Sequence, residues 1–145
     1  MRIRKATKKD LNEISKLFLA ETAKKPYQQP WNKKTSLQKI NEFFKEGDIY
    51  IVLEQNEIIG FIVLIIHLGS KGKSVHVEEL WLKSECQNKG IGRKVMEFVE
   101  KKYKKQGVRN ISLVSDKRSK AFGFYKKLKY ESYPEYMLMG KKLEK

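Results

Sequence analysis

The segment between a predicted strand and a predicted helix reads Gln87-Asn88-Lys89-Gly90-Ile91-Gly92-Arg93-Lys94. Apolar residues at helical spacing predict an amphipathic helix over 91–105, with a buried face of Ile91, Val95, Phe98 and Val99. The start of a helix presents unpaired N–H groups and a partial positive charge, so it normally favours acidic side chains. Basic residues gather there instead, which indicates a bound anion. The two glycines would let the backbone approach a pyrophosphate closely.

Two other phosphate-binding motifs fit this chain poorly. A dinucleotide fingerprint G-x-G-x-x-G needs glycine where Val95 stands, and it should open the first βαβ unit of a parallel sheet. Gly72-Lys73-Ser74 lacks the upstream glycine of a P-loop, because His67 holds that position, and a strand follows it instead of a helix. The third kind of site that could explain the segment 87–94 is a coenzyme A site.

The whole chain, residues 1–145, predicts a single α/β domain with a mixed sheet. Strands are expected at 2–6, 48–53, 58–68, 74–82 and 108–114, and a final pair at 130–133 and 136–143. Helices are expected after two capping boxes, Thr7-Lys8-Lys9-Asp10 and Thr35-Ser36-Leu37-Gln38, and over 91–105 and 119–128. Two prolines make 24–31 a loop, and Gly47 ends the second helix.

Two adjacent glutamates interrupt the strand expected at 74–82. Neighbouring side chains in a strand point to opposite faces, so Glu78 and Glu79 break strict alternation within an apolar segment. This pattern predicts a β-bulge at the two residues.

Two motifs resemble the GNAT superfamily of N-acetyltransferases. Glu79-Leu80-Trp81-Leu82 followed by Gln87-x-x-Gly90-x-Gly92 resembles its acetyl-coenzyme A motif, Q/R-x-x-G-x-G/A after a strand. The segment 121–130, Ala-Phe-Gly-Phe-Tyr-Lys-Lys-Leu-Lys-Tyr, is similar to the family's A-x-x-F-Y-x-K-x-G-F. The order of elements also matches over nearly the whole chain. The family often has proline, an aromatic residue, glycine, asparagine and glycine where this chain has Ser84, Cys86, Asn88, Arg118 and Lys129.

The resemblance implies a central, mostly antiparallel sheet flanked by helices, with splayed strands that form a coenzyme A cleft. The bulge would splay strand 74–82 from strand 108–114. The co-substrate would be acetyl-coenzyme A, with the Leu82 N–H on the thioester carbonyl and the backbone of 87–93 on the pyrophosphate. The cofactor-binding residues expected are Leu82, Gln87, Asn88, Lys89, Gly90, Ile91, Gly92, Arg93 and Lys94.

The resemblance also implies an acyltransferase in which an amine attacks the thioester directly in a ternary complex. Tyr125 is the candidate general acid for the departing thiolate, although its place beside a helical core stripe also fits a packing role. Glu79 is the candidate base for the acceptor ammonium, with Glu78 or a water molecule as alternatives. Cys86 is expected to be a small, semi-buried apolar residue. The two histidines, at 67 and 76, are expected to be structural.

The acceptor would be a primary amine, either a small molecule or the N-terminus or a lysine of a protein. By resemblance, the acceptor pocket would be framed by the loop after the first helix and by the last strands; its candidates are Tyr27, Trp31, Tyr133, Tyr136, Glu131 and Glu135. The alternative is a GNAT-fold protein without turnover, either an acyl-coenzyme A sensor or a nucleic-acid-associated module.

Composition narrows the partners further. The chain has 32 basic and 17 acidic residues, a formal net charge of +15, which would attract polyanions. The lysines are spread along the whole chain, so this charge does not indicate a specific nucleic acid as the partner. No segment reaches the ~20 apolar residues of a membrane span, and no signal peptide begins the chain, so the cytoplasm is expected. A lone cysteine and two histidines indicate no metal site. The expected state is a monomer or a homodimer.

Overall fold

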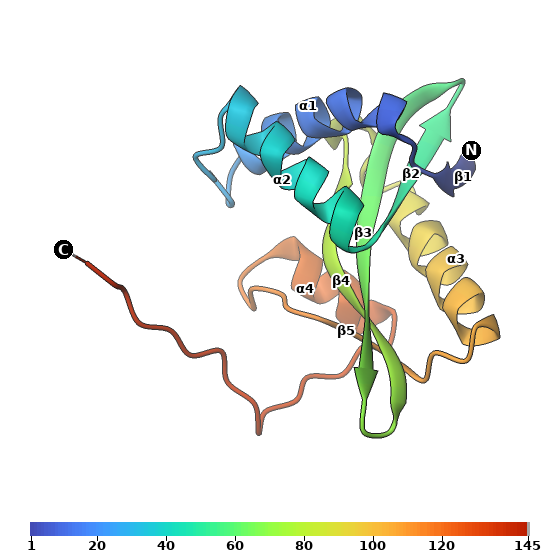
Figure 1. The fold of residues 1–145 in the computed structure, drawn as a ribbon, viewed down its shortest axis with the longest axis vertical. Coiled ribbons are helices and arrows are strands. Elements are labelled where there is room, and N and C mark those ends of the chain that lie inside the picture. The colour runs from blue at the N-terminus through green and yellow to red at the C-terminus, as the bar shows by residue number, and fades with distance from the viewer. Residues whose placement is uncertain (145) are drawn as a thin grey trace. The chain divides into compact units, whose positions relative to one another are not determined.

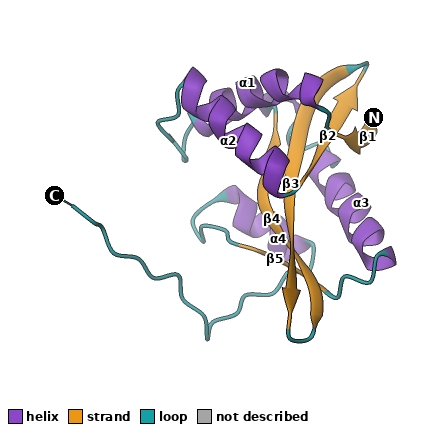
Figure 2. Ribbon diagram, viewed as in Figure 1, coloured by secondary structure: helices purple, strands orange, loops and turns teal. Residues whose placement is uncertain are grey.

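The computed structural model describes residues 1–144, which divide into two compact units, Met1–Val114 and a second unit from Ser115 onward. The elements of the first unit are shown in Figures 1 and 2: β1 (Arg2–Lys5), α1 (Leu11–Thr22), α2 (Lys33–Glu46), β2 (Asp48–Glu54), β3 (Glu57–Gly69), β4 (Gly72–Leu82), α3 (Ile91–Lys105) and β5 (Asn110–Leu113). Single 3₁₀ turns precede α1 at Lys8–Asp10 and follow β4 at Ser84–Cys86. The second unit contains α4 (Lys120–Lys127).

The sheet has five strands in the order β1-β2-β3-β4-β5. The first three junctions are antiparallel, and β4 pairs with β5 in parallel. The mixed, mostly antiparallel sheet predicted from the sequence is therefore confirmed. The β4–β5 pairing covers only Ser74 to Val77 of β4, although β4 continues to Leu82.

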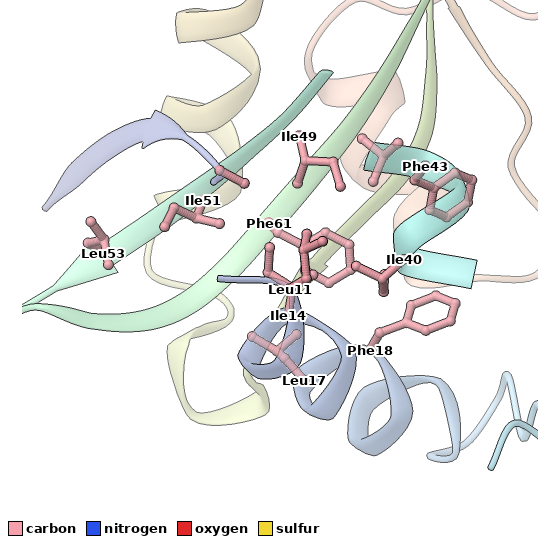
Figure 3. Packing of buried hydrophobic residues seen from close by; sticks show 12 residues of the cluster. Leu11, Ile14, Leu17, Phe18, Ile40, Phe43, Ile49, Ile51, Leu53 and Phe61 are labelled. Atoms are coloured by element: carbon pink, nitrogen blue, oxygen red, sulfur yellow. The ribbon is translucent and has the colours of Figure 1, made fainter. Parts of the chain in front are cut away.

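The hydrophobic core lies between the sheet and the pair α1 and α2. Figure 3 shows side chains from the two helices pointing toward side chains of β2 and β3. The helix residues are Leu11, Ile14, Leu17, Phe18, Ile40 and Phe43, and the strand residues are Ile49, Ile51, Leu53 and Phe61. Complete burial of one such side chain stabilises the fold by about 1.5–3 kcal/mol. Strand alternation turns Tyr50 to the opposite face, where its ring meets Phe98 of α3 at 5.5 Å between centroids. The helices thus cover both faces of the sheet.

The helix starts confirm one predicted capping box and correct the other. Before α1, the Thr7 N–H donates to the Asp10 carboxylate at 2.7 Å. Hydrogen bonds from Arg4 hold the pKa of Asp10 below its ordinary value, against the effect of burial. The second helix starts before the predicted box, because Asn32 is its N-cap and accepts the Thr35 N–H at 2.8 Å. Thr35 occupies the third helical position, which the sequence pattern had assigned to a glutamine.

The final pair of strands predicted at 130–133 and 136–143 is wrong. Within residues 129–144, all of which the structure describes, there are only turns and irregular backbone, and the apolar residues Met137, Leu138 and Met139 are exposed. An apolar, β-prone sequence becomes a strand only when a neighbouring strand accepts its backbone hydrogen bonds. The predicted strand 108–114 is shortened to β5 for the same reason, since its pairing with β4 covers four residues.

No helix within residues 1–144 has both the length and the hydropathy that a membrane crossing requires.

Candidate functional site

The predicted β-bulge is confirmed in β4. Val63 of β3 faces Glu79, and the next residue, Leu64, faces Val77, so Glu78 has no partner in the ladder. Directly opposed side chains share one face of a sheet, so Glu79 lies on the face of Val63, which belongs to the core under α1 and α2. Glu78 is exposed. The facing of these two residues, which the sequence could not decide, follows from the register.

Beyond the bulge, β4 has a free edge toward β5. The Lys83 N–H donates to the Ile59 carbonyl of the β3 side at 2.8 Å. Backbone groups of successive strand residues point to alternate sides, so the N–H and C=O of Leu82 point away from β3. The parallel pairing with β5 has already ended at Val77. The Leu82 carbonyl accepts a hydrogen bond from the Gln87 side chain at 3.0 Å, which closes the turn after β4.

Close approach of β3 and β4 at this point requires glycine at position 60. Gly60 faces Leu82, and a Cβ at Gly60 would lie 2.7 Å from the Trp81 carbonyl oxygen and would overlap the Leu82 side chain. This is a non-hydrogen-bonded pair, in which Cα atoms approach to about 4.5 Å. Gly60 therefore holds the end of β4 at its observed distance from β3.

Replacement of Gly60 by alanine should displace Leu82 and destabilise the fold by about 1–3 kcal/mol, the usual effect of overpacking. The same replacement at Gly69 is the matched control, because a Cβ there meets only ordinary contact, 3.4 Å from the Gly72 oxygen. Denaturant unfolding of both variants measures the difference. Equal stability of G60A and G69A would show that the two strands are not in tight contact at Leu82.

The start of α3 has an open, positively charged N-terminus. Gly90 is the N-cap with φ of 81°, and no side chain caps this end. Asn88 also has positive φ, 62°, a conformation that asparagine tolerates better than most residues. The first turn contains no acidic residue. Three exposed basic side chains surround it, those of Lys89, Arg93 and Lys94, and the Arg93 side chain pairs with Glu97 at 3.0 Å.

This geometry suits an anion. The first N–H groups of an α-helix have no partners within the helix, and the helix dipole adds a partial positive charge. The left-handed conformation at Gly90 would strain any residue with a side chain. The segment 82–94 thus joins a free strand edge to an uncapped helix start. This juxtaposition could hold an extended ligand with an anionic group at the helix end.

Glu79 lies in a partly buried aromatic environment. Its carboxylate accepts a hydrogen bond from Trp81 Nε1 at 2.7 Å. Burial raises the pKa of Glu79, and the nearby charge of Glu78 adds to this, while the Trp81 hydrogen bond and the charge of Lys39 oppose it. A carboxylate with a raised pKa is a stronger base when ionised, so Glu79 is suited to accept a proton.

The loop after α1 brings aromatic rings to this face. The rings of Tyr27 and Trp81 meet at 4.9 Å between centroids, and Trp31 packs on Phe18 at 5.2 Å. Tyr27 therefore lies beside the indole that binds Glu79. Trp31 packs against the core. The other aromatic candidates, Tyr133 and Tyr136, contact each other in the second unit at 6.4 Å between centroids.

Tyr125 belongs to α4 in the second unit, and its catalytic role stays a prediction. Its ring contacts Phe124 at 5.0 Å and Tyr130 at 5.6 Å between centroids. The helix ends in a Schellman motif, in which the Tyr130 N–H donates to the Tyr125 carbonyl and Lys129 adopts φ of 72°. Lys129 thus takes the left-handed position for which the family uses glycine.

His76 was expected from the sequence to be structural, and Glu21 was not among the predicted site residues. His76 Nδ1 lies 2.9 Å from Ser112 Oγ and so bridges β4 and β5. Glu21, in the last turn of α1, is buried, with 6% of its surface exposed, and it binds the segment after β4. Its position gave only a weak signal, an acidic residue near the C-terminal end of a helix, where the dipole disfavours negative charge.

Comparisons with known proteins concern the family and the fold. The sequence model of the acetyltransferase (GNAT) family matches residues 16–130. A comparison with curated protein sequences finds no significant match.

Three solved structures illustrate the likeness in fold. A possible acetyltransferase from Clostridium difficile 630 is 14% identical with a TM-score of 0.86, over 99% of this chain and 98% of that one. An aminoglycoside acetyltransferase from an uncultured soil metagenomic sample, in complex with sisomicin, is 18% identical with a TM-score of 0.75. The likeness covers 99% of this chain and 96% of that one. A predicted acetyltransferase with acetyl-CoA from Clostridium acetobutylicum is 19% identical with a TM-score of 0.70, over 96% and 95%.

Proposed function

Because the chain belongs to the acetyltransferase (GNAT) family, we propose that it transfers an acetyl group from acetyl-coenzyme A to a primary amine. The observation that carries this proposal is the free edge of β4 at Leu82, which a short turn joins to the uncapped, basic start of α3. One end offers a backbone N–H to a thioester carbonyl. The other offers backbone N–H groups and positive charge to a pyrophosphate.

The residues of this segment suit acetyl-coenzyme A. The N–H groups at the start of α3 and the side chains of Lys89, Arg93 and Lys94 would hold the pyrophosphate. The pantetheine arm would follow the edge of β4, where backbone groups beyond Val77 are not paired with β5. The Leu82 N–H would polarise the thioester carbonyl, which stabilises the negative charge that develops on its oxygen during attack.

The chemistry requires a neutral amine and a protonated leaving group. In the proposed reaction Glu79 takes a proton from the acceptor ammonium, directly or through water, and the amine nitrogen attacks the thioester carbon. The carbon–sulfur bond then breaks, and Tyr125 donates a proton to the thiolate. The attacking nitrogen loses its second proton, which restores the Tyr125 hydroxyl, so that a neutral amide and free coenzyme A leave. Tyr27 and Trp81 would line the approach of the acceptor, where aromatic faces attract a cationic amine.

Binding of acetyl-coenzyme A is the first expected result. A ligand that binds only the folded protein raises its stability by about 2.7 kcal/mol at a concentration of 100 Kd, so the melting temperature should rise. Gly90→Val should abolish this shift, because it obstructs the helix start and strains a left-handed backbone position. Thermal melts and titration calorimetry measure both effects.

Gly107→Val is the matched control for this experiment. Gly107 has the same φ of 81° and the same open surroundings as Gly90, but it lies after the other end of α3. The two variants should lose similar stability, about 1–2 kcal/mol from the left-handed backbone. Only G90V should lose the ligand. Normal binding by G90V would place the pyrophosphate elsewhere, and absence of binding by the unmodified protein would refute the proposed function.

Turnover distinguishes an enzyme from a binding protein. A panel of amine acceptors with acetyl-coenzyme A, including polyamines, aminoglycosides, and peptides with a free N-terminus or a lysine, should identify one class that releases free coenzyme A. Thiol release measured with a colorimetric reagent reports the reaction. Tight binding of acetyl-coenzyme A without turnover on any acceptor would favour the alternative, an acyl-coenzyme A sensor.

A further inference from the structure

A closed hydrogen-bonded ring joins the end of α1 to the segment after β4. The buried Glu21 carboxylate accepts hydrogen bonds from Ser84 Oγ at 2.8 Å and from Lys24 Nζ at 2.8 Å. Lys24 Nζ also donates to Ser84 Oγ at 2.7 Å, and the Ser84 N–H points at the same carboxylate at 3.3 Å. A buried carboxylate is tolerated only when its oxygens are satisfied in this way.

Ser84 stands at a decisive point of the candidate site. It is the second residue after Leu82 and the first of the 3₁₀ turn Ser84–Cys86, which leads into the segment at the start of α3. The Gln87 side chain returns to the Leu82 carbonyl across the same turn. The position of Ser84 therefore sets where the turn leaves the strand, and with it the spacing between the Leu82 N–H and the helix start.

Lys24 stands at the beginning of the opposite loop. Its carbonyl accepts the N–H groups of Tyr27 and Gln28, both at 3.0 Å. Tyr27 in turn rests on Trp81, which binds Glu79. Movement of Lys24 would therefore move the ring that flanks the proposed acceptor position.

We propose that Glu21 is a positioning residue that couples the acceptor-side loop, residues 24–31, to the cofactor loop, residues 83–93. The inference rests on the proposed function, because only that function gives the two loops different ligands. When coenzyme A orders the cofactor loop, Ser84 is held in place, and Glu21 and Lys24 transmit this order to the turn that carries Tyr27. Each ligand then favours the other without direct contact.

Hydrogen exchange with coenzyme A as the probe tests this coupling. In the unmodified protein, saturating coenzyme A should slow exchange in a peptide that covers residues 24–29. Glu21→Gln preserves the shape of the side chain. Its amide NH₂ group, however, is a donor opposite the Lys24 ammonium, which is also a donor, so the hydrogen-bonded ring of residues 21, 24 and 84 is broken. The variant should bind coenzyme A about tenfold more weakly, since hydrogen bonds to charged groups are among the stronger ones. At saturation it should no longer protect residues 24–29.

A matched control separates coupling from general loosening. Glu13→Gln makes the same change on the same helix, in an exposed pair with Lys16. This variant should retain the affinity and the protection. Ser84→Ala removes a single hydroxyl at an exposed residue and should repeat the loss, so the test does not depend on the folding of E21Q.

The outcomes are distinct. If the unmodified protein fails to bind coenzyme A, the proposed function fails. If it binds, but the peptide 24–29 shows no protection, or E21Q and S84A retain protection, then the coupling is refuted and the proposed function stands.

Discussion

Tyr125→Phe is expected to lower the single-turnover rate of acetyl transfer by about 10²- to 10⁴-fold, the usual contribution of a positioned acid. The substitution keeps the ring and its contacts with Phe124 and Tyr130, and it deletes only the hydroxyl. Affinity for acetyl-coenzyme A should hardly change, because the lost interaction belongs to the transition state. Rapid-mixing kinetics with a good acceptor are required, since slow product release would hide part of the effect in steady state.

Tyr103→Phe is the control for this experiment. The Tyr103 hydroxyl donates to Asp48 at 2.6 Å, and burial raises the pKa of Tyr103 above its ordinary value. Its removal should destabilise the fold by about 1.5–3 kcal/mol, as expected for a hydrogen bond to a charged group, without loss of rate. An unchanged single-turnover rate in Y125F would assign Tyr125 to packing alone.

Glu79→Gln is the second substitution with a large expected effect, a fall in kcat of about 10²- to 10⁴-fold. An amide cannot accept the ammonium proton, yet its oxygen can still accept the Trp81 hydrogen bond observed at 2.7 Å. Packing around residue 79 is therefore preserved. Glu78→Gln, at the exposed neighbour in the bulge, removes the same charge and should leave kcat nearly intact.

The pH dependence gives an independent test of Glu79. Burial raises its pKa above the ordinary value of 4.5, so the rate should fall as the pH decreases through that raised pKa, which lies above 4.5. This acidic limb should be absent from the residual activity of E79Q. If E78Q, and not E79Q, loses activity, then the base is Glu78; if neither does, it is water.

The contribution of Glu79 to folding stability should depend on pH in the opposite sense to its contribution to the rate. A carboxyl group whose pKa is raised by folding favours the folded state at low pH, and this contribution is lost as the pH rises through the folded pKa. E79Q therefore should be at least as stable as the unmodified protein at neutral pH. Chemical unfolding at two pH values measures this. Marked destabilisation at neutral pH would indicate that the ionised carboxylate supports the fold.

Features that depend on nearby residues could be predicted from the sequence alone. The helix over 91–105 has the predicted bounds, because apolar spacing and Gly90 act within a few turns. The bulge at Glu78 followed from two adjacent charges in an apolar strand. Two motifs, at residues 79–92 and 121–130, together with the order of elements up to α4, were sufficient to indicate the family whose sequence model matches residues 16–130.

Features that depend on contacts between distant segments were decided by the tertiary structure. The register of β3 against β4 turned Glu79 toward the core helices, and the parallel pairing fixed Val77 as the last residue of β4 that pairs with β5. The ring around Glu21 joins residues 63 positions apart, which no local pattern records. The last two predicted strands are absent for the same reason. A β-prone segment forms a strand only when another strand pairs with it, and that pairing is a property of the folded chain.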